Sequence, residues 1–149
     1  MSKLCILFVL LVMFNSCKKE AADYTQIDED IITQYITDNN LTAIATGTGL
    51  YYVIDIPGNG TQPNSQSTVT VAYKGYLTNG SVFDESPSAG ISFSLTSVIQ
   101  GWQEGIPYFK EGGSGTLLIP SSLGYGSQAT SGIPANSVLI FEVTLIDVL

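Results

Sequence analysis

The residues of this sequence best suited to chemistry are aromatic side chains that fall beside loops rich in glycine and proline. Trp102 lies on a segment too short and too rich in glycine to need so large a residue for anchoring alone, and Tyr125 lies between two glycines. Exposed loops are where binding residues gather, so a purely structural tyrosine is less expected there. A single aromatic residue is most often part of the core. Taken together, the set favours a pocket for an apolar ligand: Tyr73, Phe83, Trp102, Tyr125 and Phe141.

The composition excludes most other kinds of site. The chain of 149 residues has no histidine, which removes Ser-His-Asp and Cys-His catalysis and histidine-ligated zinc. Its two cysteines, Cys5 and Cys17, both precede any globular part, so neither a disulfide-stapled core nor a cysteine-rich metal site is expected. A net charge of −8 argues against a nucleic-acid partner, because phosphate binding needs clustered Lys and Arg. We expect one domain with no metal and no cofactor.

Two glycine-rich segments resemble catalytic motifs but lack the required context. Residues 124–129 fit the pattern G-x-G-x-x-A, yet they neither follow a strand of a βαβ unit nor open a helix. Residues 112–115 do not form a G-x-S-x-G elbow, and no base is present to activate the serine. Dinucleotide binding and serine hydrolysis are therefore not expected.

The first half of the globular part reads as strands joined by turns. Residues 49–56 form a strand that ends at a Pro-Gly-Asn-Gly turn, and in residues 68–73 Val69, Val71 and Tyr73 share one face. The dipeptide Asn79-Gly80 predicts a type I′ turn, in which both residues have positive φ. A return strand starts at residue 81.

The second half contains the one short helix. Residues 91–95 alternate as a strand, and Ser97 with Gln100 predicts a capping box that opens a helix of about two turns. Two more strands are expected over residues 115–119 and 137–146. The order predicts an α+β domain in which an antiparallel sheet wraps one short helix. The inward side of that helix is formed by Ile99, Trp102, Ile106 and Phe109.

A separate helix is expected ahead of the strands, over residues 28–38. Apolar residues recur there at spacings of three and four, acidic residues occupy the expected first turn, and Asn39-Asn40 ends it. This helix either packs on the domain and links it to what precedes, or serves in dimerisation. The oligomeric state is left open.

Four segments, in order and over essentially the whole globular part, resemble the FKBP-type peptidyl-prolyl isomerase family. Residues 71–86 are similar to its run V-x-Y-x-G-x-L-x-x-G-x-x-F-D-x-S, and residues 98–105 to V-I-x-G-W-x-E-G. Residues 119–126 and 133–143 match the closing pattern I-P-x-x-L-x-Y-G … I-P-x-N-x-x-L-x-F-x-V. The resemblance implies an FKBP-like half-barrel of antiparallel strands over the short helix, with an apolar pocket between them.

The resemblance also implies which residues form that pocket. Trp102 is expected as the floor and Tyr125 at the rim, with Asp84 nearby and Ile133 on a loop above. The sequence departs from the family at Ile91, where a pocket Phe is usual and Phe93 matches the next inward site, and in the loop before Gly132, which lacks a bulky residue. The implied walls are Tyr73, Phe83, Val98, Ile99 and Phe141.

The implied activity is rotation about X-Pro bonds in exported proteins, with proline-containing polypeptides as substrates and macrolides as candidate inhibitors. The Ile99 N–H and the Tyr125 hydroxyl would hold the flanking carbonyls, while Asp84 either polarises the site or orients Tyr73. One alternative is a chaperone or binding module that grips proline-containing or hydrophobic segments with little turnover. Another, less favoured, is a membrane-tethered structural protein with an inactive pocket.

The N-terminal residues have the features of a targeting signal. Lys3 and an apolar run over residues 4–14 have the length of a signal-peptide core, too short to span a bilayer. The small residue Ser16 followed by Cys17 resembles the lipobox of bacterial lipoproteins, whereas an ordinary secretory signal is the alternative. We therefore expect a lipoprotein of a Gram-negative cell envelope, on the outer membrane and facing the periplasm. The expected division is a signal peptide (1–16), a lipid-anchored tether (17–26), a helical extension (27–46) and the isomerase-like domain (47–149).

Overall fold

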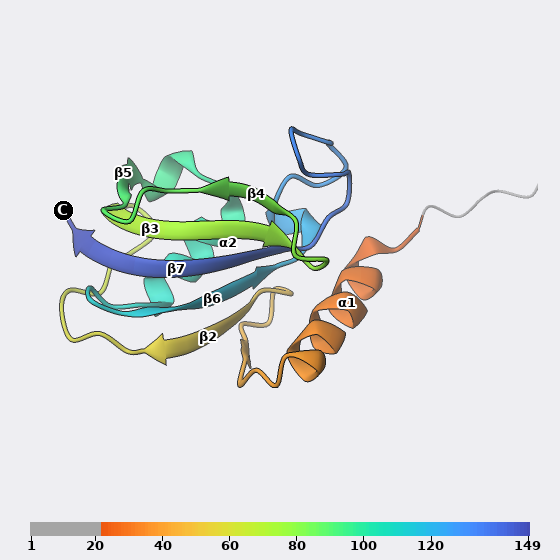
Figure 1. The fold of residues 1–149 in the computed structure, drawn as a ribbon, viewed down its shortest axis with the longest axis horizontal. Coiled ribbons are helices and arrows are strands. Elements are labelled where there is room, and N and C mark those ends of the chain that lie inside the picture. Colours follow the sequence, from red (N-terminus) through yellow and green to blue (C-terminus); the bar gives the residue numbers. More distant parts are fainter. Residues whose placement is uncertain (1–21) are drawn as a thin grey trace, which may run out of the picture.

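The computed structural model describes residues 22–149, and within them one antiparallel sheet wraps a short helix (Figure 1). Six of the seven strands follow the order β1-β2-β6-β7-β3-β4, and β5 pairs with β3 outside this order. This confirms the expected fold class. The strands are β1 (Ile44–Ala45), β2 (Tyr51–Ile56), β3 (Thr68–Leu77), β4 (Val82–Glu85), β5 (Ile91–Ser94), β6 (Ser114–Ile119) and β7 (Leu139–Val148).

The helices are α1 (Tyr24–Asp38) and α2 (Gln100–Gly105), with single 3-10 turns η1 (Leu95–Ser97), η2 (Ile106–Tyr108) and η3 (Ser121–Leu123). The expected signal peptide, Cys17 and the first half of the expected tether (residues 17–21) lie outside the described residues, and residues 24–26 of that tether belong to α1 instead. No helix within residues 22–149 combines the length and the apolar character needed to cross a bilayer.

Strand alternation divides the core between the two faces of the sheet. Along β6, Leu117 and Ile119 are buried on the α2 side, whereas Leu118 between them is buried on the α1 side. Along β7, the predicted inward set Leu139, Phe141, Val143 and Leu145 is confirmed as part of the α2-side core.

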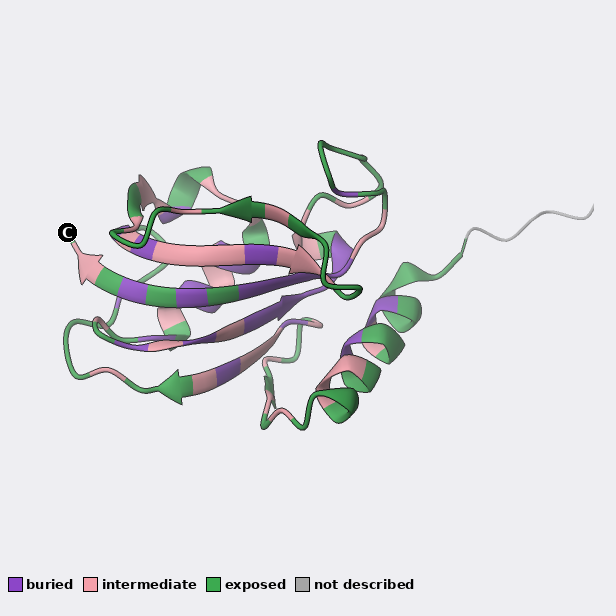
Figure 2. Ribbon diagram, viewed as in Figure 1, coloured by how far each residue is buried: buried purple, intermediate pink, exposed green. Residues whose placement is uncertain are grey.

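Helix α1 packs on the opposite face from α2. Its Ile32 is fully buried against Val53, Leu118, Val138 and Ile140. Figure 2 shows the buried positions of α1 on the side turned toward the sheet. The expectation that this helix packs on its own domain is therefore confirmed.

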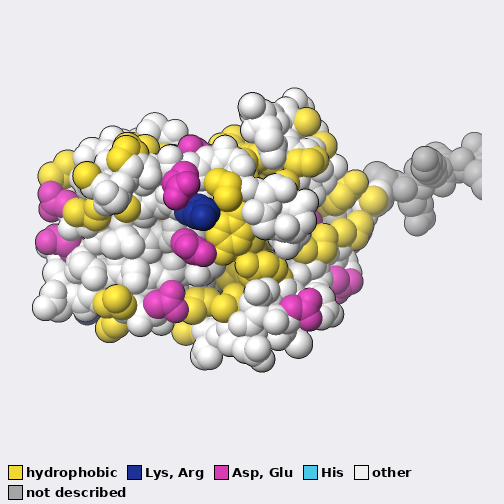
Figure 3. All heavy atoms as spheres, in the orientation of Figure 1, with side chains coloured by type: hydrophobic (Ala, Val, Ile, Leu, Met, Phe, Trp, Pro, Cys, Tyr) yellow, Lys and Arg dark blue, Asp and Glu magenta, His cyan; other side chains and the backbone are white. Residues whose placement is uncertain are grey.

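Beyond the area covered by α1, the outer face of the sheet carries polar and charged side chains. Figure 3 shows a basic side chain among acidic ones on this face. The strand register places Lys74 of β3 opposite Glu85 of β4 and Glu142 of β7. This part of the outer face, which α1 does not cover, is exposed to solvent, as is common for antiparallel sheets.

Three local predictions are wrong. Helix α1 begins at Tyr24 rather than at residue 28, because Asp23 caps it by accepting a hydrogen bond from the Thr25 N–H at 3.1 Å. The acidic residues 28–30 therefore lie beyond the first turn and do not serve the helix dipole as expected. The end at Asn39 is confirmed, with the Asn39 side-chain amide donating a hydrogen bond of 2.9 Å to the Tyr35 carbonyl.

The capping box at Ser97 is the second error. Helix α2 starts at Gln100, and its N-cap, Ile99, has no side-chain hydrogen bond. Ser94 instead caps the preceding turn η1, and the Ser97 hydroxyl donates to the Ser94 carbonyl at 2.8 Å. The intervening 3-10 turn uses the serine that a sequence pattern assigns to the helix.

The third error is the turn between β3 and β4. Gly80 has a φ of 89°, but Asn79 has no positive φ, so the turn is not type I′. The Leu77 N–H bonds the Ser81 carbonyl and the Gly80 N–H bonds the Leu77 carbonyl, which makes a three-residue loop. Such loops need only one left-handed residue, and Gly80 supplies it.

Candidate functional site

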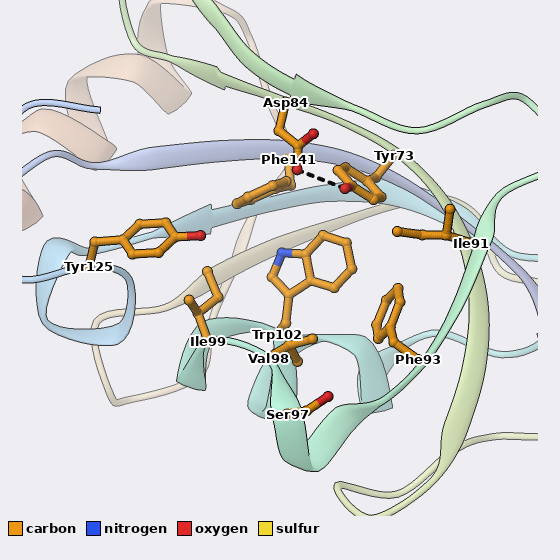
Figure 4. A pocket seen from close by; sticks show the side chains of 10 residues that line it. All are labelled: Tyr73, Asp84, Ile91, Phe93, Ser97, Val98, Ile99, Trp102, Tyr125 and Phe141. Carbon is orange, nitrogen blue, oxygen red and sulfur yellow. Dashed lines mark hydrogen bonds between the residues drawn. The ribbon is translucent and has the colours of Figure 1, made fainter. Parts of the chain in front are cut away.

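A cavity of about 590 Å³ lies between α2 and the concave face of the sheet (Figure 4). Its size falls in the usual range for small-molecule and peptide-side-chain sites. Seven of the nine side chains expected from the sequence line it: Tyr73, Asp84, Val98, Ile99, Trp102, Tyr125 and Phe141.

Trp102 forms the floor of the cavity. Its indole packs edge-to-face with Tyr73 at 5.0 Å between ring centroids and with Phe141 at 5.1 Å, and lies tilted at 5.3 Å from Phe93. The indole nitrogen is buried and has no hydrogen-bond partner within the described residues. The floor is thus held in place by aromatic contacts, and it presents an apolar surface.

Two glycines explain how α2 reaches this position. A Cβ on Gly101 would lie 2.5 Å from Ile119 Cγ2, and one on Gly105 would lie 2.6 Å from Leu117 Cδ2. The helix backbone therefore rests directly on β6. Because that side of α2 carries no side chain, Trp102 can project into the space beneath the strands.

Phe83 and Ile133, which were expected in the pocket, are not among its lining side chains. Phe83 packs edge-to-face on Phe141, with 5.4 Å between the ring centroids. Both rings cover Gly75, where a Cβ would lie 2.6 Å from Phe83 and 2.7 Å from Phe141. Phe83 therefore contacts the pocket through Phe141, a lining residue.

Ile133 is 5% exposed and belongs to the core. It exchanges two backbone hydrogen bonds of 3.0 Å with Thr130, and Gly132 lies against Phe83. The loop is thereby folded down onto the wall of the pocket. In this structure Ile133 acts as a packing residue of that wall.

Asp84 is hydrogen-bonded to Tyr73, as one of the two roles expected from the sequence requires. The Tyr73 hydroxyl donates to Asp84 Oδ2 at 2.7 Å, while Asp84 Oδ1 accepts from the Glu85 N–H at 2.9 Å. Burial, followed by the hydrogen bond and charge of Asp84, raises the pKa of Tyr73 to about 12. The Tyr73 hydroxyl is therefore neutral at physiological pH, and it donates its proton in the hydrogen bond to Asp84.

Two donors near the cavity remain free for a ligand. Among the hydrogen bonds within residues 22–149, none has the Ile99 N–H or the Tyr125 hydroxyl as its donor. Tyr125 is 43% exposed, and Figure 4 shows its hydroxyl directed toward the pocket. An apolar floor with polar donors at its margin suits a segment that is apolar in one part and carries carbonyl groups on either side.

The cavity also includes side chains outside the expected set. Ile91 and Phe93 line one end from β5, as their alternation and the comparison with the family pattern had indicated. Ser97 was missed because it was interpreted as a helix cap. Within residues 22–149, no three acidic, Cys or His side chains gather in a way that could hold a metal ion.

Comparisons with known proteins agree with this geometry. The family model described as FKBP-type peptidyl-prolyl cis-trans isomerase matches residues 59–146, more than half of the chain. The FKBP-type peptidyl-prolyl cis-trans isomerase FkpA of Buchnera aphidicola (from Schizaphis graminum) is 48% identical over 106 residues, 69% of this chain and 42% of that protein. The FkpA of Escherichia coli is 39% identical over 133 residues, 88% of this chain and 48% of that protein.

Solved structures show the same similarity. The crystal structure of Escherichia coli FkpA has a TM-score of 0.74 at 37% identity, covering 85% of this chain and 61% of that one. A peptidyl-prolyl cis-trans isomerase from Pseudomonas syringae pv. tomato has a TM-score of 0.71 at 29% identity, covering 83% and 95%. The chain spans less than half the length of the curated relatives described above.

Proposed function

The chain belongs to the FKBP-type peptidyl-prolyl cis-trans isomerase family, and from that premise we propose that its pocket catalyses rotation about X-Pro bonds in polypeptides. The observation that carries the proposal is the open cavity whose floor is the apolar face of Trp102 and whose margin holds two donors, the Ile99 N–H and the Tyr125 hydroxyl, that bond no acceptor within the described residues. The proposed substrates are proline-containing segments of unfolded or folding proteins.

The absence of histidine is no obstacle to this reaction. Rotation about the amide has a barrier of about 18–20 kcal/mol because it breaks resonance, and no covalent bond is made. In the twisted transition state the amide loses charge separation and becomes less polar than the planar ground state. A water-poor aromatic cavity therefore favours the transition state over the substrate, which is the differential binding that catalysis requires.

The residues have distinct proposed roles. The prolyl ring rests on Trp102 between the walls formed by Tyr73 and Phe141. The Ile99 N–H and the Tyr125 hydroxyl hold the carbonyls on either side of the proline, so that the chain is fixed while the bond rotates. Asp84 acts through Tyr73 by holding its ring in the wall.

A protease-coupled assay with an X-Pro peptide tests the proposal on the full chain. Replacing Trp102 by Leu, which keeps an apolar side chain, should lower kcat/KM by more than about tenfold, equivalent to about 1.4 kcal/mol of transition-state binding. The matched control is Val53→Ala, which lies on the α1 side of the sheet and should keep its rate.

A Trp102→Leu variant that folds and retains the full rate would refute the assignment of this pocket. Loss of turnover on addition of a macrolide would support an active site that the drug occupies. Suppression of client aggregation that survives Trp102→Leu, without turnover in the parent chain, would instead indicate a binding module.

We also propose that the chain is an envelope lipoprotein. The support is the apolar run over residues 4–14, followed by Ser16 and Cys17. Residues 1–16 would be removed, Cys17 acylated, and the domain held at the outer membrane facing the periplasm. The relatives named above come from Gram-negative bacteria, which have such an envelope.

Labelling with a lipid precursor in a Gram-negative host tests the anchor. Cys17→Ser should abolish incorporation, whereas Cys5→Ser, which changes the segment to be removed, should leave it intact. Equal labelling of both variants would contradict the assignment of Cys17.

A further inference from the structure

A buried acidic side chain of α1 has no role in the mechanism proposed above. Asp28 is 1% exposed, and its Oδ2 accepts hydrogen bonds from the Ser121 N–H at 2.8 Å and from the Ser121 hydroxyl at 2.6 Å. Its Oδ1 is also buried and has no partner within the described residues. Burying a carboxylate is costly, and an apolar residue of similar size would avoid that cost. The contact with Ser121 is therefore the feature that an apolar replacement would lose.

Ser121 links Asp28 to the backbone on either side of Tyr125, which lines the pocket. The Ser121 carbonyl accepts hydrogen bonds from the Gly124 N–H at 3.0 Å and from the Gly126 N–H at 2.8 Å. These two glycines are the chain neighbours of Tyr125. One residue, itself 2% exposed, thus binds α1 on one side and both neighbours of Tyr125 on the other.

The position of Tyr125 depends on its backbone, because its side chain is 43% exposed. Gly126 adopts a φ of 60°, and its carbonyl accepts from the Asn136 N–H at 2.8 Å. The turn over residues 124–126 therefore sets where the Tyr125 hydroxyl lies relative to the cavity (Figure 4).

We infer that Asp28 is a positioning residue of the pocket: by holding Ser121, it fixes the turn over residues 124–126 and so the place of the Tyr125 hydroxyl. Ile32, one helical turn further along α1, is fully buried against the sheet and keeps Asp28 in place. The consequence for catalysis rests on the proposed function. The structural link between Asp28 and the turn stands apart from it and has its own test.

Amide hydrogen exchange on the 149-residue chain tests that link. Asp28→Ala should speed exchange of the Gly124 and Gly126 amides by about tenfold or more, without changing the amides shared by β3 and β7. Asp28→Asn should restore protection, because an amide oxygen can accept both bonds from Ser121. Asp30→Ala is the matched control, since Asp30 is an exposed acid on the same helix. Unchanged Gly124 and Gly126 exchange in Asp28→Ala would overturn the inference.

A double-mutant cycle tests the effect on catalysis. Asp28→Ala should lower kcat/KM by between about twofold and tenfold, the worth of one hydrogen bond to the substrate. In a Tyr125→Ala background the same change should have no further effect, because the residue through which Asp28 acts is gone. An equal loss in both backgrounds would overturn the inference.

Ser121→Ala, which removes only the hydroxyl bond to Asp28, replaces Asp28→Ala in both experiments if the latter does not fold. A parent chain without isomerase activity would contradict the proposed function alone. The exchange of Gly124 and Gly126 would still decide whether Asp28 holds the turn.

Discussion

Helices α1 and α2 cover opposite faces of the same sheet with different kinds of side chain. The α1 contact centres on aliphatic residues such as Ile32, Leu118 and Ile140. The α2 contact centres on Trp102, surrounded by Tyr73, Phe93 and Phe141 at angles far from parallel. Aliphatic side chains interdigitate to fill space, whereas rigid rings packed edge-to-face enclose a concavity. One face of the sheet is therefore closely packed, whereas the other encloses the candidate pocket.

The largest effect on stability should come from removing a buried aliphatic side chain between α1 and the sheet. Ile32→Ala removes a fully buried side chain from α1 and should lower the free energy of unfolding by about 3 kcal/mol, measured by denaturant titration. Ile31→Ala, at a neighbouring position that is 37% exposed, should cost less than about 1 kcal/mol. Equal denaturation midpoints for Ile32→Ala and Ile31→Ala would show that α1 does not pack on the sheet in solution.

A smaller loss is expected where α2 meets the sheet. Gly101→Ala places a methyl group 2.5 Å from Ile119 Cγ2, so either α2 or β6 must shift. This overpacking should lower the free energy of unfolding by about 1–3 kcal/mol, despite the better helix propensity of alanine. The value of kcat/KM should also fall, because Trp102 is displaced. Gln100→Ala, exposed on the same helix, is the control. A Gly101→Ala variant more stable than the parent would refute the close contact.

A tyrosine hydrogen bond on the pocket side should affect both stability and kcat/KM, whereas one on the outer face should affect stability alone. Tyr73→Phe removes the donor to Asp84 and should cost about 1–2 kcal/mol in stability and a few-fold in kcat/KM. Tyr76→Phe removes the bond to Glu142, 3.0 Å long on the outer face, and should affect stability alone. Similar kcat/KM values for Tyr73→Phe and Tyr76→Phe would contradict this difference between the two faces of the sheet.

The smallest effect is expected from pH near neutrality. The pKa of Tyr73 is raised to about 12, so this group should not change the rate between about pH 7 and pH 9. Because the folded-state pKa is raised, the stabilisation by neutral Tyr73 is complete below pH 10 and is lost as pH rises toward about 12. Burial also raises the pKa of Tyr76, which adds to the same alkaline loss.

Unfolding titrations of the parent and Tyr73→Phe at rising pH measure this loss. The parent should lose more stability above pH 10 than the variant, since the variant lacks the ionising group. Parallel curves would contradict the role assigned to Tyr73.

The sequence predicts the features that periodicity and residue type determine. The alternation in β7 correctly placed Leu139, Phe141, Val143 and Leu145 on one face, and the glycines of α2 correctly marked an unusual helix around Trp102. Seven of nine expected pocket residues line the cavity because they occupy inward positions of regular elements or flank them.

Other features depend on tertiary contacts that the sequence does not show. Nothing local indicates that Phe83 and Phe141 pack together over Gly75, since this depends on the space above that glycine. The role of Asp28 was hidden for a similar reason, because its partner Ser121 lies 93 residues away. Competing local hydrogen bonds account for the error at Ser97, whose hydroxyl turns back to Ser94.

The single tryptophan of this chain is the floor of its pocket. Light absorbed selectively by an indole is therefore emitted from the place where a proline is proposed to rest. Any compound that settles there, whether or not it is turned over, should alter the colour or brightness of that emission. The protein thus carries its own optical reporter of occupancy, with no label attached.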